Sequence, residues 1–140
     1  MNDRTPAQLY ALLVGGTLVI AGIIGFFYSS DFGSPGNTDD VFGLLTVNGW
    51  HNVVHIVTGA LGLAALGYAA RAYAGGLGVV YIAVAIWGFI IGSGDSILGF
   101  IPVNTADNVL HALLGVLGVG AYLATPADAA TATPAARTAG

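Results

Sequence analysis

The chain of 140 residues contains no cysteine and few charged residues. The absence of cysteine excludes disulfides, thiolate metal sites, iron–sulfur clusters and covalently attached c-type haem. Charged side chains make up 7% of the residues, whereas a soluble domain carries about 25%. With a net charge of −4, the chain also lacks the basic surface by which proteins bind nucleic acid, so no nucleic-acid partner is expected. Hydrophobic residues account for 56% of the chain, which is the composition of a membrane protein.

Four hydrophobic stretches are each close to the roughly 17 to 25 residues that a helix needs to cross a bilayer. They run over residues 7–28, 53–70, 77–94 and 109–124. The first is too long for the apolar region of a signal peptide and is followed by no Ala-x-Ala site, so we expect it to be retained. The sequence therefore predicts an all-α membrane protein, a bundle of four transmembrane helices surrounded by the lipid bilayer.

Residues 39–65 recur at 95–121, which indicates an internal duplication. At a constant offset of 56 the identical pairs are Asp39/Asp95, Gly43/Gly99, Val47/Val103, Asn48/Asn104, Asn52/Asn108, Val53/Val109, His55/His111, Gly59/Gly115, Leu61/Leu117, Gly62/Gly118 and Ala65/Ala121. A shorter match at an offset of 63 relates the first stretch to the third, for example Tyr10 to Tyr73. The sequence predicts one membrane domain over residues 1–124, built from a two-helix repeat at 8–70 and another at 73–124.

The arginines predict how this domain sits in the membrane. Two crossings return the chain to its starting side, so the repeats would run parallel, related by a pseudo-two-fold axis along the membrane normal. Arg4, Arg71 and Arg137 then share one side, which the positive-inside rule makes cytoplasmic. We therefore expect a multi-pass inner-membrane protein with both termini in the cytoplasm, and residues 125–140, rich in small side chains, predict a disordered cytoplasmic tail. Two short apolar runs, 41–45 and 97–101, are predicted to lie at the opposite interface as bent or half-helical approaches to the next helix.

The second and fourth stretches each carry a polar stripe. With 3.6 residues per turn, one helix face collects Asn48, Asn52, His55, Gly59 and Gly62, and the equivalent face collects Asn104, Asn108, His111, Gly115 and Gly118. Because glycine permits close helix approach, the stripes are predicted to face other helices rather than lipid. Asn48 and Asn104 are interpreted as helix N-caps, which leaves Asn52, His55, Asn108 and His111 as the candidate site residues.

Several interpretations of these four residues remain open. A buried hydrogen-bond network that fixes helix register is the simplest. His55 and His111 could instead ligate a b-type haem axially, although no outer arginine is present for the propionates. A divalent metal could be bound by the two histidines together with Asp39, Asp95 and Asp107. Ion transport is disfavoured because no carboxylate lies deep in a span. His51, next to Trp50 and equivalent to an aspartate in the other repeat, is interpreted as an interfacial residue.

The segments Val47–His55 and Pro102–His111 resemble those of small bacterial membrane proteins grouped as domain of unknown function 4383. The resemblance covers residues 8–124 and implies a bacterial inner-membrane protein with four spans. It implies no activity, substrate or cofactor. The sequence thus predicts a structural or interaction component of the inner membrane, without enzymatic activity or cofactor, that associates with its own copies or with other membrane proteins. The alternative is a haem- or metal-binding redox or sensing protein that uses His55 and His111.

Overall fold

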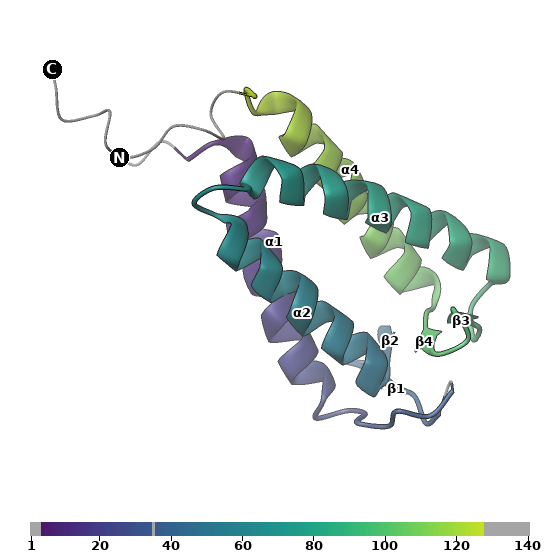
Figure 1. Cartoon of the computed structure of the whole chain (residues 1–140). Helices are drawn as coiled ribbons and strands as arrows, with labels where there is room; N and C mark the ends of the chain where they lie inside the picture. The colour runs from purple at the N-terminus through teal and green to yellow at the C-terminus, as the bar shows by residue number, and fades with distance from the viewer. Residues whose placement is uncertain (1–3, 35, 128–140) are drawn as a thin grey trace, which may run out of the picture.

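The computed structural model describes residues 4–34 and 36–127, and these residues form a mostly helical protein (Figure 1). The helices are α1 (Pro6–Gly25), α2 (Gly49–Ala65), α3 (Ala70–Ile91) and α4 (Thr105–Ala124). Three of them, α1, α3 and α4, are long and apolar enough to cross a membrane. The prediction of a mostly helical chain is therefore confirmed, and three of its helices have the length and composition of membrane spans. The remaining helix, α2, has 17 residues.

The connection between α1 and α2 and the connection between α3 and α4 each end in a short antiparallel β-hairpin. The first is formed by β1 (Asp39–Val41) and β2 (Leu45–Val47), and the second by β3 (Ser96–Ile97) and β4 (Ile101–Pro102). The predicted half-helical approaches at 41–45 and 97–101 are therefore wrong. Phe42 and Gly43 both have positive φ, as do Leu98 and Gly99, and two consecutive residues in this region make a tight hairpin turn that no right-handed helix can contain.

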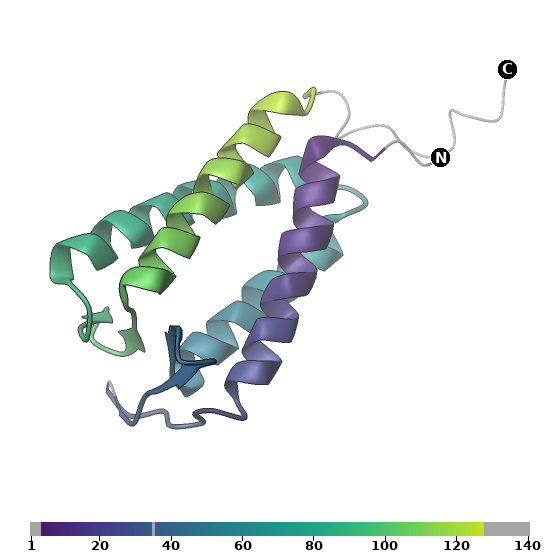
Figure 2. The same ribbon diagram turned by 180° about the vertical axis from the view of Figure 1, so that it is seen from behind.

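The helices associate as two pairs, α1 with α2 and α3 with α4, and the pairs meet at the end of the molecule where α1 begins and α4 ends (Figures 1 and 2). Small and aromatic side chains form the core at this meeting point, among them Ala7, Tyr10, Ala74 and Tyr81. Towards the opposite end the pairs diverge, and the hairpins lie at that end. The candidate site residues lie at the diverging end, since α2 and α4 both begin there.

Glycines allow the close packing within each pair. A Cβ on Gly15 would lie 2.9 Å from the Gly59 carbonyl oxygen, and one on Gly78 would lie 3.0 Å from the Gly115 carbonyl oxygen. The prediction that the glycine stripes face other helices is confirmed. Gly59, Gly115 and Gly118 pack against the first helix of their own pair, whereas Gly62 lies against Tyr73 of α3, so the glycines of the two stripes do not face each other.

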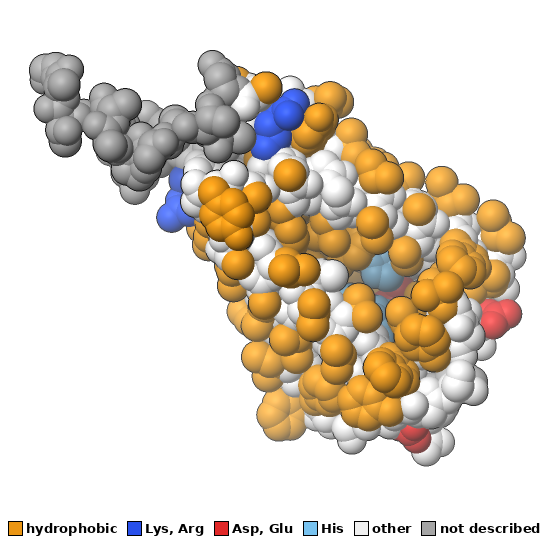
Figure 3. Space-filling view, in the orientation of Figure 1, with side chains coloured by type: hydrophobic (Ala, Val, Ile, Leu, Met, Phe, Trp, Pro, Cys, Tyr) orange, Lys and Arg blue, Asp and Glu red, His pale blue; other side chains and the backbone are white. Residues whose placement is uncertain are grey.

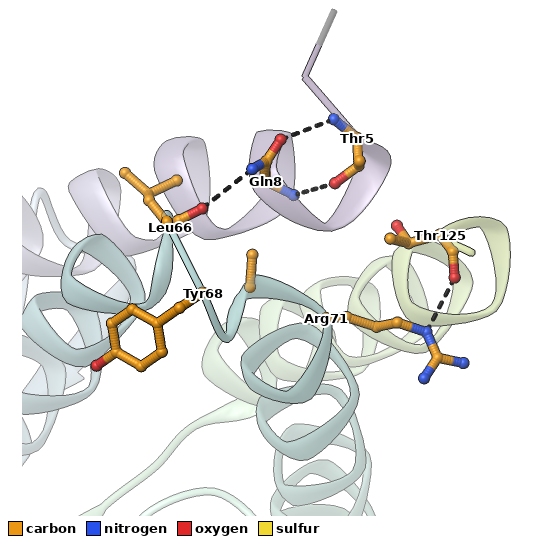
Figure 4. Close-up of a pocket in the computed structure, with 8 residues that line it drawn as sticks. Thr5, Gln8, Leu66, Tyr68, Arg71 and Thr125 are labelled. Atoms are coloured by element: carbon orange, nitrogen blue, oxygen red, sulfur yellow. Dashed lines mark hydrogen bonds between the residues drawn. The ribbon is translucent and has the colours of Figure 1, made fainter. Parts of the chain in front are cut away.

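Hydrogen bonds tie the helices together at the end that carries the termini (Figure 4). Gln8 donates through Nε2 to the Leu66 carbonyl at 3.1 Å, and Arg71 donates through Nε to the Thr125 carbonyl at 2.9 Å. The Thr125 hydroxyl accepts from the Ala7 amide at 2.9 Å, and Thr125 is buried. Residue 125, where the predicted tail begins, is therefore held by the folded part of the chain, whereas residues 128–140 lie outside the described residues.

Candidate functional site

The site is built on the two asparagine N-caps, and their predicted role is confirmed. Oδ1 of Asn48 accepts a hydrogen bond from the His51 amide, and Oδ1 of Asn104 accepts one from the Asp107 amide, each at 2.9 Å. The sequence did not reveal what the amide groups of these side chains do. Nδ2 of Asn48 donates to the Phe100 carbonyl and Nδ2 of Asn104 donates to the Leu44 carbonyl, each at 2.7 Å. Each cap thus holds the hairpin that precedes the other capped helix.

The next pair of asparagines is buried one turn further into the helices. Asn52 donates through Nδ2 to the Ser29 carbonyl at 2.8 Å, and its side chain lies against Gly25. Asn108 lies in the same way against Gly88. Oδ1 of both asparagines is buried without a hydrogen-bond partner among the residues that the structure describes. The two asparagines therefore lie in separate crevices and do not meet.

The histidines, in contrast, converge. His55 and His111 have ring centroids 6.4 Å apart, and His51 lies beside both, at 4.5 Å from His55 and 6.1 Å from His111. One ring nitrogen from each histidine can be chosen so that all three lie within 4.8 Å of one another. We call His51, His55 and His111 the histidine cluster.

The interpretation of His51 as interfacial is wrong, because only 2% of its surface is exposed. Its ring lies between the two hairpins, with Nδ1 2.9 Å from the Thr46 carbonyl oxygen, and the Pro102 carbonyl also interacts with it. His51 and His55 are four residues apart and share one face of α2, which was the signal available in the sequence. That spacing alone does not predict a cluster, because the third histidine is on α4.

His111 completes the cluster from α4 and is 6% exposed. Its ring packs against Tyr81 of α3 with centroids 4.9 Å apart. Nδ1 of His111 is buried without a hydrogen-bond partner among the described residues. An unpaired buried nitrogen of this kind costs about 1 to 3 kcal/mol, and a bound ion or solvent molecule would remove that cost.

The aspartates predicted as metal ligands lie outside the histidine cluster. Asp107 is buried, and its Oδ2 accepts from the amides of Thr46 and Asn104, both at 3.0 Å. Asp39 and Asp95 accept from the amides that follow them, at 2.7 and 2.8 Å, on the exposed start of each hairpin. Among the described residues, the group that could hold a metal contains the three histidines and no carboxylate.

Two cavities border His55 of α2. The histidine cluster lines one of about 80 Å³ that also borders Tyr81 and the second hairpin. A second cavity, of about 220 Å³, lies between α1 and the first hairpin and reaches His55 and Asp107. Figure 3 shows histidine side chains in a hollow of a largely apolar surface. Sites for whole small molecules occupy roughly 300 to 1,000 Å³, so the smaller cavity suits an ion better than a haem.

Comparison with known proteins places the chain in a family. Neither the curated proteins nor the solved structures include a match to this chain. The sequence model described as "Domain of unknown function (DUF4383)" matches residues 8–124, the range over which the resemblance was seen. Because this match covers most of the chain, the protein belongs to the DUF4383 family.

Proposed function

We propose that this protein is a multi-pass protein of the bacterial inner membrane that binds a transition-metal ion at the histidine cluster, as a binding or sensing component rather than an enzyme. One observation carries the proposal, namely that ring nitrogens of His51, His55 and His111 lie within 4.8 Å of one another. Neutral imidazole is a common ligand for zinc, copper, iron and nickel.

The cluster needs only a small adjustment to hold an ion. Metal–nitrogen bonds of about 2.0 to 2.1 Å require ligand nitrogens roughly 3.3 to 3.5 Å apart, so the rings would close by small side-chain rotations. The Thr46 carbonyl next to Nδ1 of His51 would fix that ring, as outer partners of metal-bound histidines do. An ion bound through Nδ1 of His111 would also supply a partner for that otherwise unpaired nitrogen.

The distribution of charge supports the predicted orientation. Arginine side chains lie at the end with the termini, and acidic side chains lie at the far end (Figure 3). The positive-inside rule would make the arginine end cytoplasmic, which puts the histidine cluster in the outer half of the membrane. In this arrangement α2, whose 17 residues are at the lower limit for a span, is the fourth crossing, and each helix pair is one copy of a parallel repeat.

A structural role without any ion is the competing function. In that account His51 joins the two hairpins through the carbonyls of Thr46 and Pro102, and the polar residues only hold the diverging helices in register. Association with further copies of the chain or with another membrane protein would then be the activity.

The metal content of purified protein separates the two accounts. Protein extracted in detergent from cells grown with added transition metals should carry one ion per chain. His55→Ala and His111→Ala should lose it, whereas Gln8→Ala, a change at the opposite end of the molecule, should keep it. Metal-free protein that also fails to take up any of these ions in vitro would favour the structural account.

A further inference from the structure

The histidine cluster offers an ion no negative charge. Its members are three imidazoles, which bind metals in the neutral form, and the group contains no carboxylate among the described residues. The buried carboxylate of Asp107 accepts from two backbone amides and is not part of the cluster. A bound ion would therefore keep its full charge inside the protein.

A buried site that does not neutralise the charge of its ion discriminates strongly between ions of different charge. The free energy of moving an ion from water into an apolar interior grows with the square of its charge, so a divalent ion costs about four times as much as a monovalent ion of the same radius. His51 is 2% exposed and His111 is 6% exposed, so water can offset little of this cost at these two rings, and only the half-buried His55 is open to it. Zinc sites with three histidines normally reduce it through a fourth ligand, a water molecule or hydroxide.

The surroundings of the cluster are unfavourable for such a fourth ligand. The walls of the 80 Å³ cavity include Val54, Leu77, Val80 and Val84. Buried water typically needs two to four polar partners. Besides the imidazoles, the cavity offers the hydroxyls of Tyr81 and Thr58. Thr58 already donates to the Val54 carbonyl at 2.7 Å, whereas the Tyr81 hydroxyl is buried without a partner among the described residues. A water molecule on the ion would thus have one protein hydroxyl to bind, fewer than the usual two to four polar partners, so the cavity favours an ion that is satisfied by three nitrogen ligands.

We infer that the histidine cluster binds Cu(I), as a three-coordinate ion, in preference to Zn(II) and other divalent metals. Cu(I) is monovalent, and imidazole is a suitable ligand for copper. The inference rests on the proposed function, since it requires that the cluster binds a metal at all. The rest of the chain offers Cu(I) little competition, because it contains no cysteine and a single methionine, Met1.

Competition between ions tests this preference on the unmodified protein. Metal-free protein in detergent would be titrated without oxygen, using Cu(I) buffered by bicinchoninate and Zn(II) buffered by a chromophoric chelator. We expect one Cu(I) per chain, bound at least tenfold more tightly than Zn(II). Ag(I), a monovalent ion that needs no reductant, should also displace Zn(II). His51→Ala and His111→Ala should each remove the tight Cu(I) site, and Gln8→Ala should retain it.

The possible results separate a failure of the Cu(I) preference from a failure of the proposed metal site. Binding of Zn(II) at the same histidines, equal to or tighter than Cu(I) and resistant to Ag(I), would overturn the preference and leave the metal site standing. Failure of all three ions to bind would overturn the preference for Cu(I), and failure of iron and nickel as well would overturn the proposed metal site. Cu(I) binding that survives the loss of His51 and of His111, in variants with unchanged helical content, would place the ion elsewhere and refute the inference.

Discussion

His51 and Asp107 stand 56 residues apart at equivalent positions of the two helix pairs, and they line different cavities. His51 joins the histidine cluster beside the second hairpin, whereas Asp107 reaches the cavity beside the first hairpin. The difference at this one position gives one cavity three nitrogen ligands and gives the other a carboxylate. In the proposed metal site, the residue at position 51 therefore determines which ion binds.

Exchanging the residue type at this position should shift the preference of the site towards Zn(II). His51→Asp would place a negative charge in the cluster, so the ratio of Zn(II) affinity to Cu(I) affinity should rise by about tenfold or more, equivalent to ~1.4 kcal/mol. Competitive titration measures this ratio. Asp107→Asn is the matched control and should leave the ratio unchanged, since Asp107 lies outside the cluster. An unchanged ratio in His51→Asp would contradict the argument from charge.

Adjacent glycines in α1 should respond differently to the same substitution. A Cβ at Gly15 would meet the backbone of α2 at 2.9 Å, whereas one at Gly16 would have no neighbour within 4 Å. Gly15→Ala should lower the free energy of unfolding by about 1 to 3 kcal/mol through overpacking. Gly16→Ala should be neutral or stabilising, because alanine favours the helix. Thermal unfolding in detergent compares the two, and equal tolerance would mean that α1 and α2 do not pack as described.

The two roles of Asn104 can be separated by one change. Asn104→Ser keeps an oxygen for the N-cap of α4 and removes the Nδ2 donor to the Leu44 carbonyl. Hydrogen exchange should become faster in residues 39–47, while the helical content stays the same. Asn104→Ala should show the faster exchange and an additional loss of stability of about 0.5 to 2 kcal/mol. Unaltered exchange in the hairpin would mean that the Asn104 side chain does not hold it.

Reporter insertions test the orientation. The connection between α2 and α3 is confined to residues 66–69, so a reporter within it, for example at Gly67, should read cytoplasmic, as should a fusion after Ala124. An insertion at Gly36 should read external. Readings on opposite sides for Gly67 and Ala124 would exclude two crossings per repeat.

Local patterns in the sequence predicted the features that depend on one helix. Asn48 and Asn104 could be recognised as caps from their positions, and the glycine stripes from helical periodicity. The hairpins were missed because their signal was a glycine after Phe42 and after Leu98 within apolar runs that also suit a helix. His51 was missed for another reason. Its burial depends on α2 beginning at Gly49 and on hairpins from both halves closing around its ring, which no single segment encodes.

X-ray absorption of the protein loaded with one ion per chain tests the histidine cluster most directly, because it counts the imidazoles bound to the metal. We expect the metal in the unmodified protein to be bound by three imidazoles, from His51, His55 and His111. This coordination should be lost in His51→Ala. An ion with two imidazoles whose spectrum is unchanged in His51→Ala, or one held by oxygen ligands alone, would contradict the account.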